Sequence, residues 1–236
     1  SAPCFSYGTI DPIAALGDLA QQRGLWLHVD ACVGGYLAPF VAKAGYPVPA
    51  FDFAVPGVTS LSADLHKFGF CPKPASTVFY RSTAQAACQP FEIDDWPGGK
   101  FATATLVGTR PGGAIAGAWA TLQSMGERGY VDTARQIMEL VAAYRDGIEA
   151  IGLSVLGGPD LSILCFNSNE VDMLRVGELM AAHGWLPGLV REPKAMHLML
   201  SMLHAPACED YLRDLRAAVT QVRQENGTTA KLDVTY

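Results

Sequence analysis

Apolar positions follow two different patterns over the first thirty residues. Asp11-Pro12 can cap and start a helix, and apolar residues then recur with helical spacing as far as Gly24, at Ile13, Leu16, Leu19 and Ala20. The next six residues, LWLHVD at 25–30, form a short apolar run typical of a strand buried on both faces. A helix followed by such a strand is the repeating unit of an open sheet, and it predicts an α/β fold.

Similar patterns continue to the end of the chain. Strands are predicted at 58–62, 76–81, 161–166 and 197–201, and helices at 114–151, 171–183 and 207–224. Residues 95–113, rich in glycine and proline, are predicted to form a loop, and the helix after them is expected to break near Gly126–Gly129. A boundary near residue 130 would give two domains, 1–130 and 131–236.

Composition and charge exclude several classes of protein. Half of the 236 residues are hydrophobic and 17% are charged, unlike a disordered chain. There are 17 basic and 23 acidic residues, a net charge of −6. No nucleic-acid partner is therefore expected, because proteins that bind phosphate backbones are usually basic. The sequence has no apolar stretch long enough for a transmembrane segment, and its first residues do not resemble a signal peptide.

The six cysteines are scattered, without a CxxC pair or a metal-type His/Cys spacing. No metal site is therefore expected. In a chain of this size such cysteines are typical of free, mostly buried thiols in a reducing compartment, which predicts a cytoplasmic protein.

Two titratable positions follow predicted strands. Asp30 ends an apolar strand and is followed by Gly34-Gly35, which allow close approach of a ligand. Lys67 follows the strand VTSLS and lies beside His66 and Asp64. A lysine in a dry pocket near other cations has a lowered pKa and can act as a nucleophile. A lysine opposite a carboxylate is what a pyridoxal phosphate (PLP) site requires, although a capping aspartate and a solvated lysine would give the same spacing.

Longer motifs carry a family resemblance. HVDA and the HK pair are shared with group II amino-acid decarboxylases, which are fold-type I PLP enzymes. More specific are HVDAC-x-GG, S-x-S-A-D-x-H-K-[FY]-G and DWPGGKFATATLVGTRPGG at 95–113, with GERGYVD at 126–132 and SMLHA at 201–205. With these motifs the chain resembles the sphingosine-1-phosphate lyase family over nearly its whole length. The resemblance implies a PLP-dependent transferase-like α/β fold and indicates the later part of a larger protein.

The resemblance also implies roles for individual residues. Lys67 matches the lysine that forms a Schiff base with PLP, and Asp30 matches the acid that pairs with the pyridine nitrogen. His28 lies on the same side of its strand as Asp30 and could reach the cofactor. Asp64 and His66 are candidates for the neighbourhood of the cofactor phosphate, although His66 could instead be a packing residue.

Cations further along the chain suit the substrate phosphate. Lys73 matches a second family lysine, and its alternative is a solvated loop lysine. Gly108, Thr109 and Arg110 belong to a run that could cradle a phosphate. Gly108 and Thr109 are candidates for binding the cofactor, and Arg110 is a candidate for binding the substrate phosphate. The same run could instead form a tight turn.

The implied reaction is a retro-aldol cleavage of a phosphorylated sphingoid base to a long-chain aldehyde and phosphoethanolamine.

Residues 1–130 would be the later part of the large PLP-binding domain, with the start of an interdomain helix, and 131–236 a small C-terminal α/β domain. A homodimer is expected. Ser6-Tyr7 and Pro74 depart from the family pattern, at positions that bear on the substrate and not on the cofactor. The alternatives are a group II amino-acid decarboxylase and a non-catalytic fragment that needs an N-terminal companion.

Overall fold

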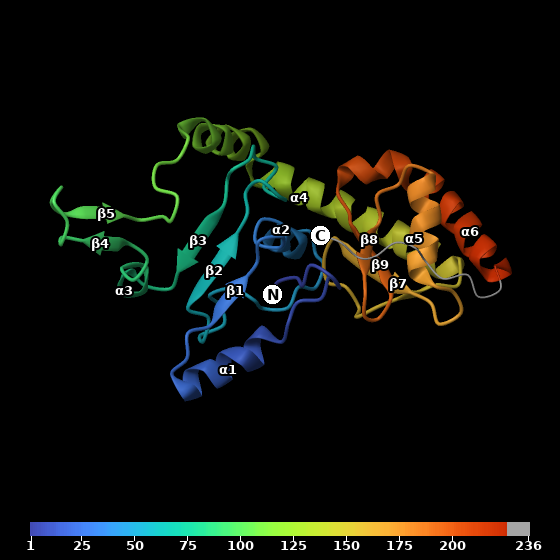
Figure 1. Ribbon diagram of the computed structural model, residues 1–236, viewed down its shortest axis with the longest axis horizontal. Coiled ribbons are helices and arrows are strands. Elements are labelled where there is room, and N and C mark those ends of the chain that lie inside the picture. Colours follow the sequence, from blue (N-terminus) through green and yellow to red (C-terminus); the bar gives the residue numbers. More distant parts are fainter. Residues whose placement is uncertain (226–236) are drawn as a thin grey trace. The chain divides into compact units, whose positions relative to one another are not determined.

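The computed structural model describes residues 1–225, which form two compact units (Figure 1). The first unit comprises residues 1–2, 12–37 and 49–126. The second comprises residues 3–11, 38–48 and 127–225 of the described chain. The domain boundary near residue 130 stays a prediction. The last eleven residues of the predicted second domain, 131–236, lie outside the described residues.

The first unit contains a three-stranded sheet in the order β1-β2-β3, formed by His28–Asp30, Ser60–Ala63 and Thr77–Tyr80. Strands β1 and β2 are parallel, and β3 runs antiparallel to β2. The prediction that the first strand is buried on both faces is wrong, because Val29 is buried whereas both of its neighbours in β1 are exposed. Successive side chains of a strand point to opposite faces, so β1 leaves one face open in the described chain.

Helix α1, Ile13–Arg23, ends at Gly24, whose left-handed conformation allows the turn into β1. The predicted apolar stripe is only partly right, because Leu16 and Leu19 are exposed and the buried positions include Gly17. A Cβ at Gly17 would lie 2.5 Å from the Val55 side chain, so the close approach at this glycine sets the buried side. Pro12, predicted to be the first helical residue, occupies the N-cap position of this helix.

The predicted loop at 95–113 is partly wrong. Phe101–Thr103 forms strand β5, which pairs with β4, Phe91–Ile93, after the short helix α3, Thr83–Ala86. Helix α4, Gly112–Ala150, follows and is interrupted at Gly126, where φ is 57° and ψ is 178°. The expected break is confirmed, because glycine adopts positive φ without the steric cost that other residues meet.

The second unit contains a four-stranded antiparallel sheet in the order β6-β7-β9-β8. These strands are Ser154–Val155, Ile163–Asn167, Ala195–Met199 and Gly188–Val190. Helices α2, Ala38–Lys43, α5, Met173–Ala182, and α6, Cys208–Gln224, and the 3₁₀ helix η1, Met202–Ala207, belong to the same unit. The strands and helices predicted beyond residue 150 are confirmed to within about two residues at each end.

The core of the second unit is fully buried. Its largest side chains include Tyr144, Phe166, Ile163, Met196 and Leu215, each with less than 2% of its surface exposed. The segment 3–11 packs against the same sheet. The Phe5 carbonyl accepts a hydrogen bond from His197 at 3.1 Å, and the Ile10 amide donates to Asp160 at 2.8 Å.

None of the helices within residues 1–225 could span a membrane, since each is too short or too polar.

Candidate active site

The candidate site lies at the carboxyl ends of β1 and β2. Because these strands are parallel neighbours, their carboxyl ends meet at one edge of the sheet, where open α/β sheets bind ligands. Asp30 is the last residue of β1, and Lys67 follows β2 by four residues. The loops after the two strands are joined by a hydrogen bond from the Asp64 amide to the Cys32 carbonyl, 3.2 Å long.

The Lys67 amine has two partners at this edge. Its Nζ donates a hydrogen bond to the Cys32 sulfur at 2.9 Å and lies 3.1 Å from a carboxylate oxygen of Asp64. Burial alone would lower the pKa of Lys67, but the contacts with Cys32 and Asp64 outweigh it and raise the pKa. The lowered pKa expected from the sequence is therefore wrong, because the nearest charged partner is an anion. Lys67 is a protonated amine at neutral pH in the described chain.

Asp30 is held as an anion. One carboxylate oxygen accepts hydrogen bonds from the Cys32 backbone amide at 3.0 Å and from the Ser62 hydroxyl at 3.2 Å. Burial would raise the pKa of this carboxyl, but hydrogen bonds from Cys32 and Ser62 and the nearby Lys67 charge lower it overall. The carboxylate suits a cationic ring nitrogen.

Cys32 connects the two groups. It contacts the Lys67 amine and also interacts through its side chain with Asp30, and burial raises the pKa of its thiol. The amine and the carboxylate predicted for a PLP site therefore lie around one sulfur atom. An amine, an anionic carboxylate and a neutral thiol on one sheet edge fit the aldehyde and the ring nitrogen of PLP.

Asp64 and His66 form a second small cluster. The Ser76 hydroxyl donates to one oxygen of Asp64, and the other oxygen lies 3.7 Å from Nε2 of His66. Nδ1 of His66 lies 2.7 Å from the carbonyl oxygen of Ala75 and also within hydrogen-bond distance of the Ala75 amide. Asp64 thus orients Lys67 and Ser76. The predicted role of Asp64 and His66 near a phosphate stays a prediction.

His28 reaches Asp30 through a serine. Its two ring nitrogens lie 2.8 Å from the Ser60 hydroxyl and 3.3 Å from the Ser62 hydroxyl, and Ser62 in turn donates to Asp30. The sequence prediction did not include these two serines. The S-x-S spacing could have indicated them, since alternate residues of β2 stand opposite His28 and Asp30 in the strand register.

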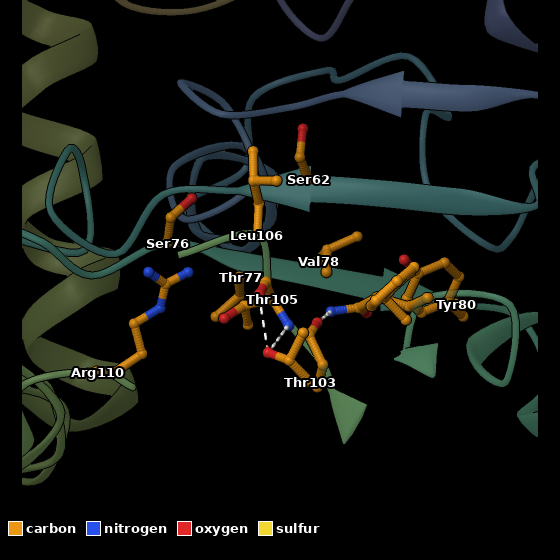
Figure 2. Close-up of a pocket in the computed structure, with 12 residues that line it drawn as sticks. Ser62, Ser76, Thr77, Val78, Tyr80, Thr103, Thr105, Leu106 and Arg110 are labelled. Atoms are coloured by element: carbon orange, nitrogen blue, oxygen red, sulfur yellow. Dashed lines mark hydrogen bonds between the residues drawn. The ribbon is translucent and has the colours of Figure 1, made fainter. Parts of the chain in front are cut away.

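A cavity of about 970 Å³ lies beside the site (Figure 2). Ser62, Ser76 and Thr77 contribute to its lining, and Arg110 is the one charged side chain among the described residues that line it. Figure 2 shows the Arg110 side chain extending toward Ser76. A guanidinium beside hydroxyl groups suits an anion such as a phosphate.

The other predicted phosphate ligands lie outside that lining. Lys73, Gly108 and Thr109 are exposed and do not line this cavity in the described part of the chain. The carbonyl of Gly108 accepts a hydrogen bond from the Thr105 hydroxyl at 2.8 Å, which is a contact typical of a turn. Their assignment to phosphate groups therefore stays a prediction.

In a comparison with protein families, residues 4–167 match the pyridoxal-dependent decarboxylase conserved domain. Among curated proteins, the chain is similar to sphingosine-1-phosphate lyase of Arabidopsis thaliana, with 42% identity over 228 residues. It is also similar to sphingosine-1-phosphate lyase 1 of Rattus norvegicus, with 41% identity over 226 residues. The matches cover 96% and 94% of this chain but only 42% and 40% of those proteins. The chain thus spans about two fifths of the length of these relatives.

Solved structures of PLP-dependent enzymes superpose on this chain and share its fold. A sphingosine-1-phosphate lyase from Burkholderia pseudomallei superposes with a TM-score of 0.89 and 40% identity, covering 93% of this chain and 51% of that one. A glutamate decarboxylase from Lactobacillus brevis superposes with a TM-score of 0.75 at 17% identity, covering 94% of this chain and 54% of that one. The predicted α/β fold of PLP-dependent fold-type I enzymes is confirmed.

Proposed function

Because the chain belongs to the pyridoxal-dependent decarboxylase family, we propose that its protein is a PLP-dependent carbon–carbon lyase. The proposed reaction is the retro-aldol cleavage of a phosphorylated sphingoid base, of the sphingosine-1-phosphate type, to a long-chain aldehyde and phosphoethanolamine. The similarity to proteins named sphingosine-1-phosphate lyase, over nearly all of this chain, supports the choice of substrate.

One observation carries the proposal: the Lys67 amine and the Asp30 carboxylate meet around Cys32 at one sheet edge. Bound PLP would supply an electron sink for the carbon–carbon cleavage. Lys67 would bind the cofactor through its amine after transferring its proton, for which Asp64 is the nearest carboxylate. Asp30 would hold a proton on the pyridine nitrogen, because an anion there favours the cationic ring.

Arg110 is proposed to bind the substrate phosphate in the cavity beside this edge, and Lys73 to act as a second cation for it. Ser62 and Ser76 line the same cavity, and their hydroxyl protons are donated to Asp30 and Asp64, so Arg110 is the donor in this lining that is proposed for the phosphate. His28 is proposed to support Asp30, which it reaches through Ser62.

The test compares the wild-type protein with Lys67→Ala in the presence of added PLP. We expect a lysine-dependent absorption band that borohydride fixes covalently in the wild type, and no such band in the variant. Lys100→Ala is a matched control, because Lys100 is exposed and pairs with Glu92 away from the sheet edge. A band that persists in Lys67→Ala, or its absence from folded wild-type protein, would contradict the assignment.

Product analysis then distinguishes the two reactions that this family makes plausible. A long-chain aldehyde together with phosphoethanolamine supports the lyase. Release of carbon dioxide from an amino acid, with no cleavage of the phosphorylated sphingoid base, would support a decarboxylase instead.

A homodimer is proposed as the working form. The hairpin β4-β5 exposes apolar side chains such as Phe91, Trp96 and Phe101, and an isolated two-stranded hairpin is marginally stable in water. A second copy that covers these side chains would stabilise the hairpin. Light scattering should give twice the mass of one chain, and Phe101→Asp should shift the protein toward the monomer.

A cytoplasmic location is also proposed. All six cysteines, which lie within the described residues, are free thiols, as expected in a reducing compartment.

A further inference from the structure

Five polar side chains on β1, β2 and the residues just before β1 form a continuous series of hydrogen bonds. In spatial order they are Trp26, Ser60, His28, Ser62 and Asp30, here called the Trp26–Asp30 chain. Successive donor–acceptor distances are 2.9, 2.8, 3.3 and 3.2 Å. The strand register places Ser60 opposite His28 and Ser62 opposite Asp30, so one face of the β1-β2 pair carries the series.

The Asp30 end determines the direction of these bonds. An ionised carboxylate can only accept hydrogen bonds, so the single hydroxyl proton of Ser62 goes to Asp30. The Ser62 oxygen must then accept its second bond, and Nε2 of His28 must carry the proton that it accepts. In a neutral imidazole the other nitrogen, Nδ1, is consequently an acceptor.

The Trp26 end is compatible with the same direction. An indole Nε1–H can only donate, so the Ser60 oxygen accepts from Trp26 and its own proton is available for Nδ1 of His28. The acceptor-only group at the Asp30 end thus sets the tautomer, and the donor-only group at the Trp26 end fits it. Every hydroxyl and ring nitrogen in the series is satisfied, with no donor facing a donor.

Burial does not force the bond made by Trp26. Half of the surface of this side chain is exposed, so its indole N–H could have bonded to water. The edge of the ring packs against Tyr80, with the ring centres 6.3 Å apart, and this contact orients the indole toward Ser60. The position of Trp26 thus adds a donor to a series that would otherwise end at Ser60.

We propose that the Trp26–Asp30 chain holds His28 in its Nε2–H tautomer and keeps Asp30 ionised, with Trp26 and Ser60 as positioning residues. Each bond is polarised toward the carboxylate, so each donor strengthens the next one. The consequence for a cofactor nitrogen beside Asp30 rests on the proposed function, whereas the tautomer and the charge of Asp30 do not.

The test uses nuclear magnetic resonance on the whole protein without cofactor, at mildly alkaline pH. Histidine labelled with ¹⁵N reports which ring nitrogen carries the proton, and His28→Gln identifies the His28 signal. We expect the Nε2–H tautomer in the wild type. Carboxyl ¹³C signals of labelled aspartate report the titration of Asp30, whose midpoint should rise by about one pH unit in Ser62→Ala. Smaller rises are expected in Ser60→Ala and Trp26→Phe.

Two control variants separate the effect of the Trp26–Asp30 chain from general effects on the fold. Trp119→Phe changes an exposed tryptophan that is not part of the Trp26–Asp30 chain, and it should leave the His28 and Asp30 signals as in the wild type. Ser60→Thr keeps the hydroxyl and should retain the wild-type titration that Ser60→Ala loses. An Nδ1–H tautomer in the wild type would overturn the proposal. So would an Asp30 titration that moves in Ser62→Ala but not in Ser60→Ala or Trp26→Phe. Failure of PLP binding alone would leave these results unchanged, so it would count only against the proposed function.

Discussion

The four-stranded and the three-stranded sheet of this chain differ in what covers them. In the four-stranded sheet, residues 163–166 of β7 are buried on both faces, in a core of large apolar side chains. In the three-stranded sheet, β1 buries Val29 and exposes the neighbours that carry the polar series. The large apolar core and the proposed chemistry thus lie on different sheets. A substitution in the four-stranded sheet should mainly change the free energy of unfolding, and one on the open face of β1 should mainly change binding or catalysis.

The largest expected effect is on the buried sheet. Phe166 is fully buried in β7, and Phe166→Ala should lower the free energy of unfolding by about 3–5 kcal/mol, because it leaves a cavity that the packed sheet cannot fill. Leu186→Ala is the control, since Leu186 is almost fully exposed and its loss should change stability by less than about 0.5 kcal/mol. Denaturant unfolding measures both, and equal losses would contradict the contrast between covered and exposed positions.

The next effect is on the open face. Asp30→Asn keeps the shape of the side chain but removes the negative charge, and it should lower turnover by about 10²–10³-fold. Its free energy of unfolding should stay close to that of the wild type. Asp18→Asn, at an exposed position of α1, provides a matched loss of charge with no expected effect on turnover. Unfolding of Asp30→Asn at a much lower denaturant concentration would show that this face also carries stability.

The smallest expected effect is a pH dependence in the second unit. Burial lowers the pKa of His197, partly offset by its hydrogen bond to the Phe5 carbonyl. The unfolded chain therefore takes up a proton before the folded one, and stability should fall as the pH drops below about 6.5. The loss is about 1.4 kcal/mol for each unit by which the pKa is lowered.

His197→Gln should reduce this acid dependence, and unfolding curves measured at several pH values would detect the change. An unchanged slope would mean that other groups are responsible. His183→Gln is a matched control, since His183 lies at the exposed end of α5.

The sequence predicted most elements because their signals are local. The break in α4 follows from a glycine that can adopt positive φ, and β7 follows from a short apolar run between turn residues. The buried side of α1 could not be predicted in the same way. It depends on the close approach of Gly17 to Gly57, forty residues away in the sequence, and periodicity within one helix carries no such information.

The candidate site shows the same limit. Lys67 and Asp30 could be singled out from their positions after strands, and the structure places both at one sheet edge. The direction of the Lys67 pKa shift could not be predicted, because it depends on whether the nearest charge is Asp64 or a cation. The alternating serines of β2 acquire their meaning only from the register with β1, which pairs residues about thirty positions apart.

The packing of residues 3–11 on the four-stranded sheet has a consequence for folding during synthesis. Phe5 is bound by His197, 192 residues later in the chain. At about 5–20 residues per second, a ribosome needs roughly 10 to 40 s to reach that histidine after it has made Phe5. For that interval residues 3–11 lack the strand β9 that carries His197. Their apolar residues are then available to chaperones or to other nascent chains, so slower translation of the stretch that leads to His197 would prolong the exposure of residues 3–11.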